Sequence, residues 1–233
     1  SIALALYLPP LRPMESWSGR IYRDAWMEQI SRELPALVKD LLCNQIDVDI
    51  IDEEGILAGE KRDGALHIAD EAYRLIVLPS LDALALKTVQ ALGEFCRAGG
   101  MVLSVGALPR LADTPANRSA LAGELAALFE GERARRVKPA ELVAEIRRWI
   151  SPDVILSLPN PEILCTHYFL EGRHVYFIIN NAPSPAQIRP VLRQPGPYTL
   201  YQPLTGATAP LVEPLCLDLD GYGAAFVVCK EGR

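Results

Sequence analysis

Residues Tyr73–Arg110, YRLIVLPSLDALALKTVQALGEFCRAGGMVLSVGALPR, decide the fold of the N-terminal half of this chain. Leu75–Leu78 is a continuous apolar run, which is typical of a strand buried on both faces. Apolar residues then recur at helical spacing over Leu84–Cys96. Gly99–Gly100 ends that helix, because glycine readily adopts the left-handed conformation, and Met101–Val105 forms the second buried strand. The stretch therefore predicts a βαβ unit with a right-handed crossover.

The rest of the N-terminal half predicts further strands and helices of the same layered class. Pro35 should kink or split the first long helix. Partial alternation of polar and apolar residues in the second strand indicates a sheet edge. The expected strands are Ile2–Leu8, Ile46–Ile51 and a small one at Ala65–Ile68, and the expected helices are Tyr22–Cys43, Asp52–Ala58, Ala116–Phe129 and Pro139–Ile150. We expect a flavodoxin-like α/β domain over residues 1–150, with a parallel sheet of strand order 2-1-3-4.

After Pro152 the pattern changes to short β-rich runs separated by turn signals. This spacing predicts a small antiparallel β-sandwich domain over residues 151–233. Glu171–Arg173 is short enough to join the runs on either side of it as a β-hairpin. The runs are Val154–Leu158, Ile163–Leu170, His174–Asn180, Tyr198–Tyr201, Leu215–Leu219 and Ala224–Cys229.

Composition and charge narrow the function classes. Half of the 233 residues are hydrophobic, so the chain can bury a sizeable core. The formal net charge of −6 argues against a nucleic-acid-binding protein. The most basic stretch, Arg133–Arg148, is interleaved with Glu132, Glu141 and Glu145. Such mixed charge favours a solvated helix face over a phosphate-binding patch.

Five scattered cysteines form no CxxC pair, so we expect no zinc site, no other metal and no cofactor. Cys43 and Cys96 fall on apolar helix faces and are predicted to be core thiols. Unpaired cysteines favour a reducing compartment, and we expect a bacterial cytoplasmic protein. Ile2–Leu8 is too short for a membrane span or a signal peptide. Because the chain starts at Ser1 without methionine and stops after a predicted strand, we expect a piece of a longer protein.

A ligand site in an open parallel sheet lies beyond the carboxyl ends of the strands, where the strand order reverses. For the order expected here, the loops at that point are Pro9–Arg20 and Pro79–Ala83. Polar side chains there could contact a polyol, although an ordinary surface loop or one that packs on a neighbouring domain explains them as well. The candidate binding residues are Ser16, Trp17, Ser18, Arg20 and Ser80.

No catalytic constellation is predicted from the residue pattern. The three histidines are His67, His167 and His174, and the last two flank one hairpin, where they are expected on strand faces rather than in a triad. The adjacent carboxylates Asp52–Glu54 follow an edge strand, which favours a charged helix start over the opposed pair of a glycosidase. We therefore predict no catalytic residue in this chain.

Phe95–Pro109, FCRAGGMVLSVGALP, resembles the "R-x-G-G, strand, nucleophile elbow" stretch of class I glutamine-amidotransferase-like domains. That resemblance implies a flavodoxin-like fold. Active members of the family carry a cysteine at the elbow, where this chain has Gly106, and no histidine follows it in the N-terminal half. The amidotransferase activity is therefore not expected here.

Three further segments resemble the C-terminal part of large α-L-rhamnosidase-type enzymes. Ile46–Leu57 (IDVDIIDEEGIL), Thr166–Ala182 (THYFLEGRHVYFIINNA) and Leu200–Leu211 (LYQPLTGATAPL) occur in the order of those enzymes' "x-D-x-I-D-E-x-x-L", "H-R-x-x-x-G-x-x-Y-F-x-x-N" and "W-D-P-x-T-G" motifs. Tyr168 and Gln202 depart from the pattern. In such glycoside hydrolases this region follows the catalytic barrel, and in β-galactosidases of this type it serves in trimer formation.

The resemblance implies a non-catalytic accessory region of a glycoside hydrolase. Its expected partner is the catalytic domain of the same polypeptide or another copy of the chain, with no nucleic acid and no membrane. One alternative is a free-standing hydrolase or amidase that uses Ser104 or a cysteine. Another is a carbohydrate-binding module whose tyrosines stack on sugars; the candidates are Tyr168, Tyr176, Tyr198, Tyr201 and Tyr222.

Overall fold

The computed structural model describes residues 3–7 and 25–230, and the chain divides into two compact units. The first unit joins the chain up to residue 38 with residues 48–145, and the second joins residues 39–47 with the chain from residue 146 onward. The short segment 39–47 therefore packs with residues that follow it by about a hundred positions in the sequence. Within the described residues, no helix is long and apolar enough to cross a membrane.

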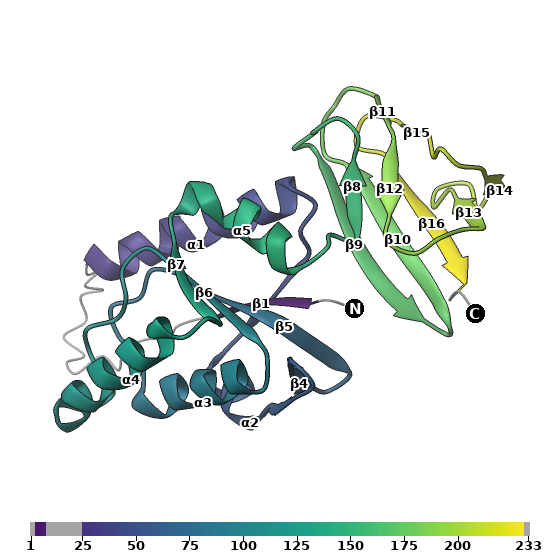
Figure 1. The fold of residues 1–233 in the computed structure, drawn as a ribbon. Coiled ribbons are helices and arrows are strands. Elements are labelled where there is room, and N and C mark those ends of the chain that lie inside the picture. Colours follow the sequence, from purple (N-terminus) through teal and green to yellow (C-terminus); the bar gives the residue numbers. More distant parts are fainter. Residues whose placement is uncertain (1–2, 8–24, 231–233) are drawn as a thin grey trace, which may run out of the picture. The chain divides into compact units, whose positions relative to one another are not determined.

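The first unit is a mixed sheet flanked by helices (Figure 1). Its strands are β1 (Ala3–Tyr7), β2 (Val48–Ile51), β3 (Glu60–Arg62), β4 (Ala65–Ile68), β5 (Glu71–Leu78), β6 (Met101–Val105) and β7 (Ala134–Val137). Helices α1 (Ala25–Cys43), α2 (Glu53–Ala58), α3 (Leu86–Arg97), α4 (Arg118–Glu130) and α5 (Leu142–Trp149) connect them. Strands β2, β1, β5, β6 and β7 are all parallel in that spatial order. The β3–β4 hairpin pairs antiparallel with the first residues of β5.

The predicted βαβ unit is present as β5, α3 and β6, and its buried residues form the centre of the core. All five residues of β6 are buried, as are the last four of β5. Helices α2, α3 and α4 lie on one face of the sheet (Figure 1). Phe95 of α3 is fully buried there and packs with Leu92 and Leu125.

Local chemistry explains where these elements begin and end. The Asp52 carboxylate accepts a hydrogen bond of 2.9 Å from the Gly55 amide and so caps α2, as expected for a charged helix start. Gly99 after α3 has a φ of 102°, which L side chains rarely adopt. A Cβ on Gly100 would lie 2.1 Å from the Phe95 ring, so only glycine allows this close approach. The prediction that two glycines end this helix is confirmed.

The prediction for Arg133–Arg148 is wrong in its first part. Residues 134–137 form β7, the last parallel strand, and not a helix face. Ala134 is buried, whereas Arg135 and Arg136 are exposed. Two adjacent arginines mask the strand in the sequence, because a strand at a sheet edge tolerates charged side chains. The short strand β3 was also not predicted.

The second unit consists of antiparallel sheets. Its strands are β8 (Val154–Leu156), β9 (Ile163–Leu170), β10 (Arg173–Asn180), β11 (Ala186–Ile188), β12 (Pro190–Leu192), β13 (Tyr198–Tyr201), β14 (Thr208–Leu211), β15 (Leu217–Leu219) and β16 (Ala224–Lys230). Five of them form a sheet in the order β14-β13-β16-β10-β9, and β11–β15 and β8–β12 form two small sheets. The predicted β9–β10 hairpin is confirmed: Glu171 and Gly172 both have positive φ, as a tight two-residue hairpin turn requires.

Buried and exposed side chains alternate along the strands of this unit, and the buried ones form one core. In β10, His174, Tyr176, Ile178 and Asn180 are buried while the residues between them are partly exposed. Buried residues of both small sheets, such as Val154, Ile188 and Leu217, belong to the same apolar cluster as those of β9, β10 and β16. Strands β11, β12 and β14 were not predicted: β12 and β14 each contain a proline, which argues against a strand, and β11 has only one β-branched residue.

Segment 39–47 joins the second unit through the free edge of β9. The Gln45 side-chain amide donates to the carbonyls of Ile163 (2.8 Å) and Asn160 (3.3 Å). The Asp47 carboxylate accepts a hydrogen bond of 3.3 Å from the amide of His167. Two side chains therefore satisfy backbone groups at a strand edge that would otherwise pair with another chain.

Candidate functional site

The elbow after β6, where the resemblance places a nucleophile, is built around Gly106. Its φ is 86°, and its carbonyl accepts a hydrogen bond of 3.2 Å from the Arg136 guanidinium of β7. A Cβ at this position would lie 3.4 Å from the Cβ and Oγ of Ser80, which follows β5. The carboxyl ends of the two central strands thus meet here, and the position that a nucleophile would occupy has no side chain.

Ser104 and, among the cysteines, Cys96 are poorly suited to act as nucleophiles. Ser104 is 1% exposed within β6, so a substrate carbonyl has no access to its hydroxyl. The Cys96 thiol lies 3.3 Å from the Arg133 carbonyl, to which it donates a hydrogen bond. Burial raises the pKa of Cys96 to about 11. A thiol that stays protonated at neutral pH is a weak nucleophile.

The predicted binding loop is placed only in part. Ser16, Trp17, Ser18 and Arg20 lie outside the described residues. Ser80 is described, and it lies half-buried at the expected end of β5. The loops after β5 and β6 are held together, because the Asp82 carbonyl accepts hydrogen bonds from the amides of Arg110 and Leu111. Ser80 and Gly106 therefore lie together at the carboxyl ends of β5 and β6, whereas the switch point expected from the sequence lies between β1 and β5. The role of Ser80 as a binding residue stays a prediction.

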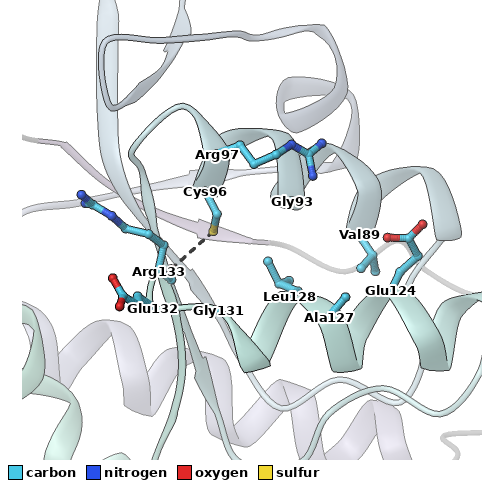
Figure 2. A pocket seen from close by; sticks show the side chains of 10 residues that line it. All are labelled: Val89, Gly93, Cys96, Arg97, Glu124, Ala127, Leu128, Gly131, Glu132 and Arg133. Carbon is cyan, nitrogen blue, oxygen red and sulfur yellow. Dashed lines mark hydrogen bonds between the residues drawn. The ribbon is translucent and has the colours of Figure 1, made fainter.

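A cavity of about 250 Å³ lies between α3 and α4 (Figure 2). Cys96 and Leu128 face it from the two helices, and Arg97 and Glu124 lie at its rim (Figure 2). Gly93 and Ala127 leave the space open because their side chains are small. The sequence did not point to this cavity, since its lining comes from the faces of two separate helices.

The second unit contains a row of buried polar side chains in contact with one another, which was not predicted from the sequence. His167 Nδ1 lies 2.8 Å from Oδ1 of Asp153, and His167 Nε2 lies 3.0 Å from Nδ1 of His174. The Arg193 guanidinium lies 2.9 Å from the same Asp153 oxygen and also donates to the Ser151 carbonyl.

The histidines lie on strand faces, as predicted, but they contact each other. The His167 ring stacks on Tyr176 with a centroid distance of 4.4 Å. The Tyr176 hydroxyl accepts a hydrogen bond of 3.1 Å from the Gln194 amide, and burial raises the pKa of Tyr176 to about 12. The spacing of seven residues between His167 and His174, across a two-residue turn, is the signal that could have revealed the pair.

Carboxylates do not form a paired site at the positions considered. Asp52 caps α2, and Glu53 pairs with Lys87 at 3.1 Å. Among the described residues, no group of three or more His, Cys, Asp and Glu side chains is arranged to hold a metal ion. The charged helix start expected at Asp52–Glu54 is therefore confirmed.

The tyrosines do not form a common sugar-stacking face. Tyr176 and Tyr198 are buried, and Tyr201 is half-buried. Tyr168 is exposed near the turn end of the β9–β10 hairpin, whereas the exposed Tyr222 precedes β16 at the opposite end of the same sheet. Through the register, Tyr168 is level with Val228, four residues from the start of β16 at Ala224. At about 3.3 Å per residue these four steps alone span roughly 13 Å, too far for both tyrosines to stack on one sugar ring.

Comparison with known proteins shows which solved structures share this fold. No protein-family model matches the sequence, and no curated protein is significantly similar to it. Solved structures do match. A rhamnosidase from Novosphingobium sp. PP1Y superimposes with a TM-score of 0.66 at 21% identity, over 81% of this chain and 20% of that chain. The fold is that of a region of glycoside hydrolases.

Two further structures match nearly the whole chain. The GH42 β-galactosidase Gan42B from G. stearothermophilus matches with a TM-score of 0.58 at 12% identity, over 99% of this chain and 40% of that chain. An exo-carrageenase GH42 from Bacteroides ovatus matches with a TM-score of 0.58 at 11% identity, over 98% of this chain and 29% of that chain. The chain thus spans between a fifth and two fifths of these proteins, and at such identities the likeness is one of fold.

Proposed function

We propose that this chain is an accessory, non-catalytic region of a glycoside hydrolase, which supports the catalytic barrel or mediates domain and subunit contacts. The observation that supports this most is the match of 97–99% of the chain to β-galactosidases, because a match of that extent takes in both units. The rhamnosidase match supports the same class of parent enzyme. The partner is then the catalytic domain of the same polypeptide or a second copy.

We assign the first unit to the flavodoxin-like, class I glutamine-amidotransferase-like domains. We propose domain bounds of 1–150, which also take in residues 39–47 and 146–150 of the second unit. Its support is the parallel order β2-β1-β5-β6-β7, which is the flavodoxin order when the β3–β4 hairpin is set aside. We assign residues 151–233 to a β-sandwich. Its support is the single core shared by the five-stranded sheet and the two small sheets.

The elbow chemistry favours this proposal over a free-standing hydrolase. Gly106 supplies no nucleophile, and Ser104 is buried within the sheet. Catalysis would then come from carboxylates of another domain, as glycoside hydrolysis requires. A bacterial cytoplasm fits the five free cysteines.

The experiment compares this region with the enzyme that contains it. In the full-length polypeptide, a substitution that destabilises the first unit, Gly99→Ala, is combined with measurements of molar mass by light scattering and of turnover of 4-nitrophenyl glycosides. We expect a lower melting temperature and a smaller assembled fraction, with kcat of the folded enzyme unchanged within about twofold. A large loss of kcat at a temperature where the variant is fully folded and assembled would contradict an accessory role.

A further inference from the structure

The five-stranded sheet of the second unit (Figure 1) is apolar on both of its faces. Its inner face carries core residues such as Tyr176 and Val227. Because side chains alternate along a strand, the residues between these point to the opposite side, which we call the outer face. A sheet face that stays in water is usually polar, so an apolar outer face indicates that another surface covers it. On the central strands β10 and β16 the apolar residues of the outer face are Val175, Phe177, Ile179, Ala224, Phe226 and Val228.

The strand register joins these residues into one patch. Val175 lies between Val228 and Tyr168 in the neighbouring strands. Phe177 lies beside Phe226, and their rings stack with a centroid distance of 4.5 Å. No residue of β10 or β16 on the outer face is buried, whereas the inner residues of β10 all are. Within the part of the chain that the structure describes, no layer is therefore packed tightly over this patch, as is typical of a protein-binding surface.

Opposite charges lie at the two ends of the outer face. At one end the exposed Arg173 and Lys230 are directly opposite each other in neighbouring strands, where like charges repel. At the other end lies the exposed Glu162, which continues the β9–β10 ladder because its carbonyl accepts a hydrogen bond of 2.8 Å from the Asn181 amide. The eight positions from Arg173 to Asn181 span roughly 26 Å at about 3.3 Å per residue, so the two ends cannot pair within one copy.

We propose that the outer face binds the outer face of a second copy of this chain, with the strands of the two copies antiparallel. A two-fold axis that crosses the strands within the interface brings the cationic end of each copy over the acidic end of the other. Arg173 and Lys230 then face Glu162 of the second copy, while Phe177, midway along the patch, lies near the axis. A two-fold axis parallel to the strands would stack the two cationic ends on each other, which repulsion disfavours.

The size of the outer face fits a reversible dimer. Strands about 4.8 Å apart and roughly 26 Å long give a face of roughly 500 Å² per copy, and about 1,000 Å² in total. This area is at the lower end of what specific complexes bury, so we expect a dissociation constant in the micromolar range. The dimer deepens the proposed function, on which it rests for its role in the enzyme, because it gives the proposed subunit contacts a defined surface.

Sedimentation velocity of the whole 233-residue chain tests the dimer between about 1 and 200 μM. The mass should rise with concentration from the 25.6 kDa of one copy toward twice that value. Val175→Lys places a charge within the apolar patch and should raise the dissociation constant at least about tenfold. The matched control is Val191→Lys, because Val191 is an exposed valine on β12 of the small β8–β12 sheet, and the dissociation constant should stay within about twofold.

Charge reversal tests the antiparallel arrangement through exposed residues, so it also decides the question if Val175→Lys does not fold. Glu162→Lys should weaken the dimer about threefold to tenfold, because it brings a third cation to each cationic end. Adding Arg173→Glu and Lys230→Glu exchanges the charges of the two ends and should restore the dissociation constant to within about threefold. Since the ends lie far apart in one copy, such a rescue requires contact between copies.

A chain that stays monomeric at the highest concentration overturns the proposal. Equal effects of Val175→Lys and Val191→Lys, or a triple variant that associates no better than Glu162→Lys alone, also overturn it. A monomeric chain whose residues 224–228 exchange amide hydrogens more slowly in the longer polypeptide assigns the outer face to the catalytic domain instead of a second copy. Each of these results leaves the accessory role to be decided separately, by turnover of glycosides.

Discussion

Replacing Gly99 with alanine should destabilise the first unit strongly. At a φ of 102°, on the left-handed side of the Ramachandran map, an L residue raises the free energy of the folded state by about 1–2 kcal/mol relative to glycine. The new Cβ would also lie 3.2 Å from the Cα of Gly64. The Gly64 backbone is held in place, because its amide donates a hydrogen bond of 2.8 Å to the Ala98 carbonyl. Crowding of this kind adds roughly 1 kcal/mol, so we expect a total cost of about 2–3 kcal/mol.

The matched control is Gly123→Ala, which makes the same chemical change inside α4. No atom lies within 4 Å of a Cβ at Gly123, and the position is helical. Alanine there should stabilise by about 0.5–1 kcal/mol, because it reduces the entropy of the unfolded chain and favours the helix.

Thermal unfolding followed by far-UV circular dichroism measures both variants, since the helical signal reports chiefly on this unit. For a domain of this size, the predicted cost lowers the midpoint of Gly99→Ala by about 4–12 °C, and Gly123→Ala should melt at or above the parent temperature. The reasoning is refuted if Gly99→Ala melts at or above the parent temperature, or if both variants shift in the same direction by the same amount.

Further predictions concern the second unit and the buried tyrosines. Asp153→Asn should cost about 2–4 kcal/mol, because it leaves Arg193 largely buried beside a neutral amide. The control Glu60→Gln, in an exposed ion pair, should leave stability nearly unchanged. Equal losses of the two variants in urea denaturation would contradict this. Among the tyrosines whose side chains the structure describes, three should titrate near pH 12 in an absorbance titration, because burial favours the neutral phenol. Since their folded pKa values are raised, their stabilising contribution is present below pH 10 and is lost as the pH rises toward 12, which alkaline denaturation measures. These residues are Tyr73, Tyr176 and Tyr198.

The sequence predicted elements wherever local signals agree with the fold. Met101–Val105 and Ile163–Leu170 form strands at the predicted residues, because the first is a continuous apolar run and the second is a β-rich run between turn signals. Gly172 indicates the turn of the β9–β10 hairpin in the sequence, because glycine readily adopts the positive φ that both Glu171 and Gly172 have there. Residues 134–137 were misjudged, since the exposed Arg135 and Arg136 lie on an edge strand and give the sequence no apolar period.

The candidate sites were harder to predict than the strands. Asp153, His167 and Arg193 meet only because the register of β9 and the chain around β8 and β12 bring them together, and no sequence motif encodes that register. The position of Ser80 follows from the sequence, because the carboxyl end of a buried strand is a defined place in a parallel sheet, but its role in binding stays a prediction. That it lies beside Gly106 also follows from this topology.

The central claim is that catalysis by the parent enzyme lies outside this chain. The most direct measurement is turnover of 4-nitrophenyl α-L-rhamnoside and 4-nitrophenyl β-D-galactoside by the purified 233-residue chain and by the longer polypeptide that contains it. The account predicts hydrolysis by the longer polypeptide and no turnover above the uncatalysed rate by the chain itself. Hydrolysis by the chain that is abolished by Ser80→Ala or Ser104→Ala would contradict the account.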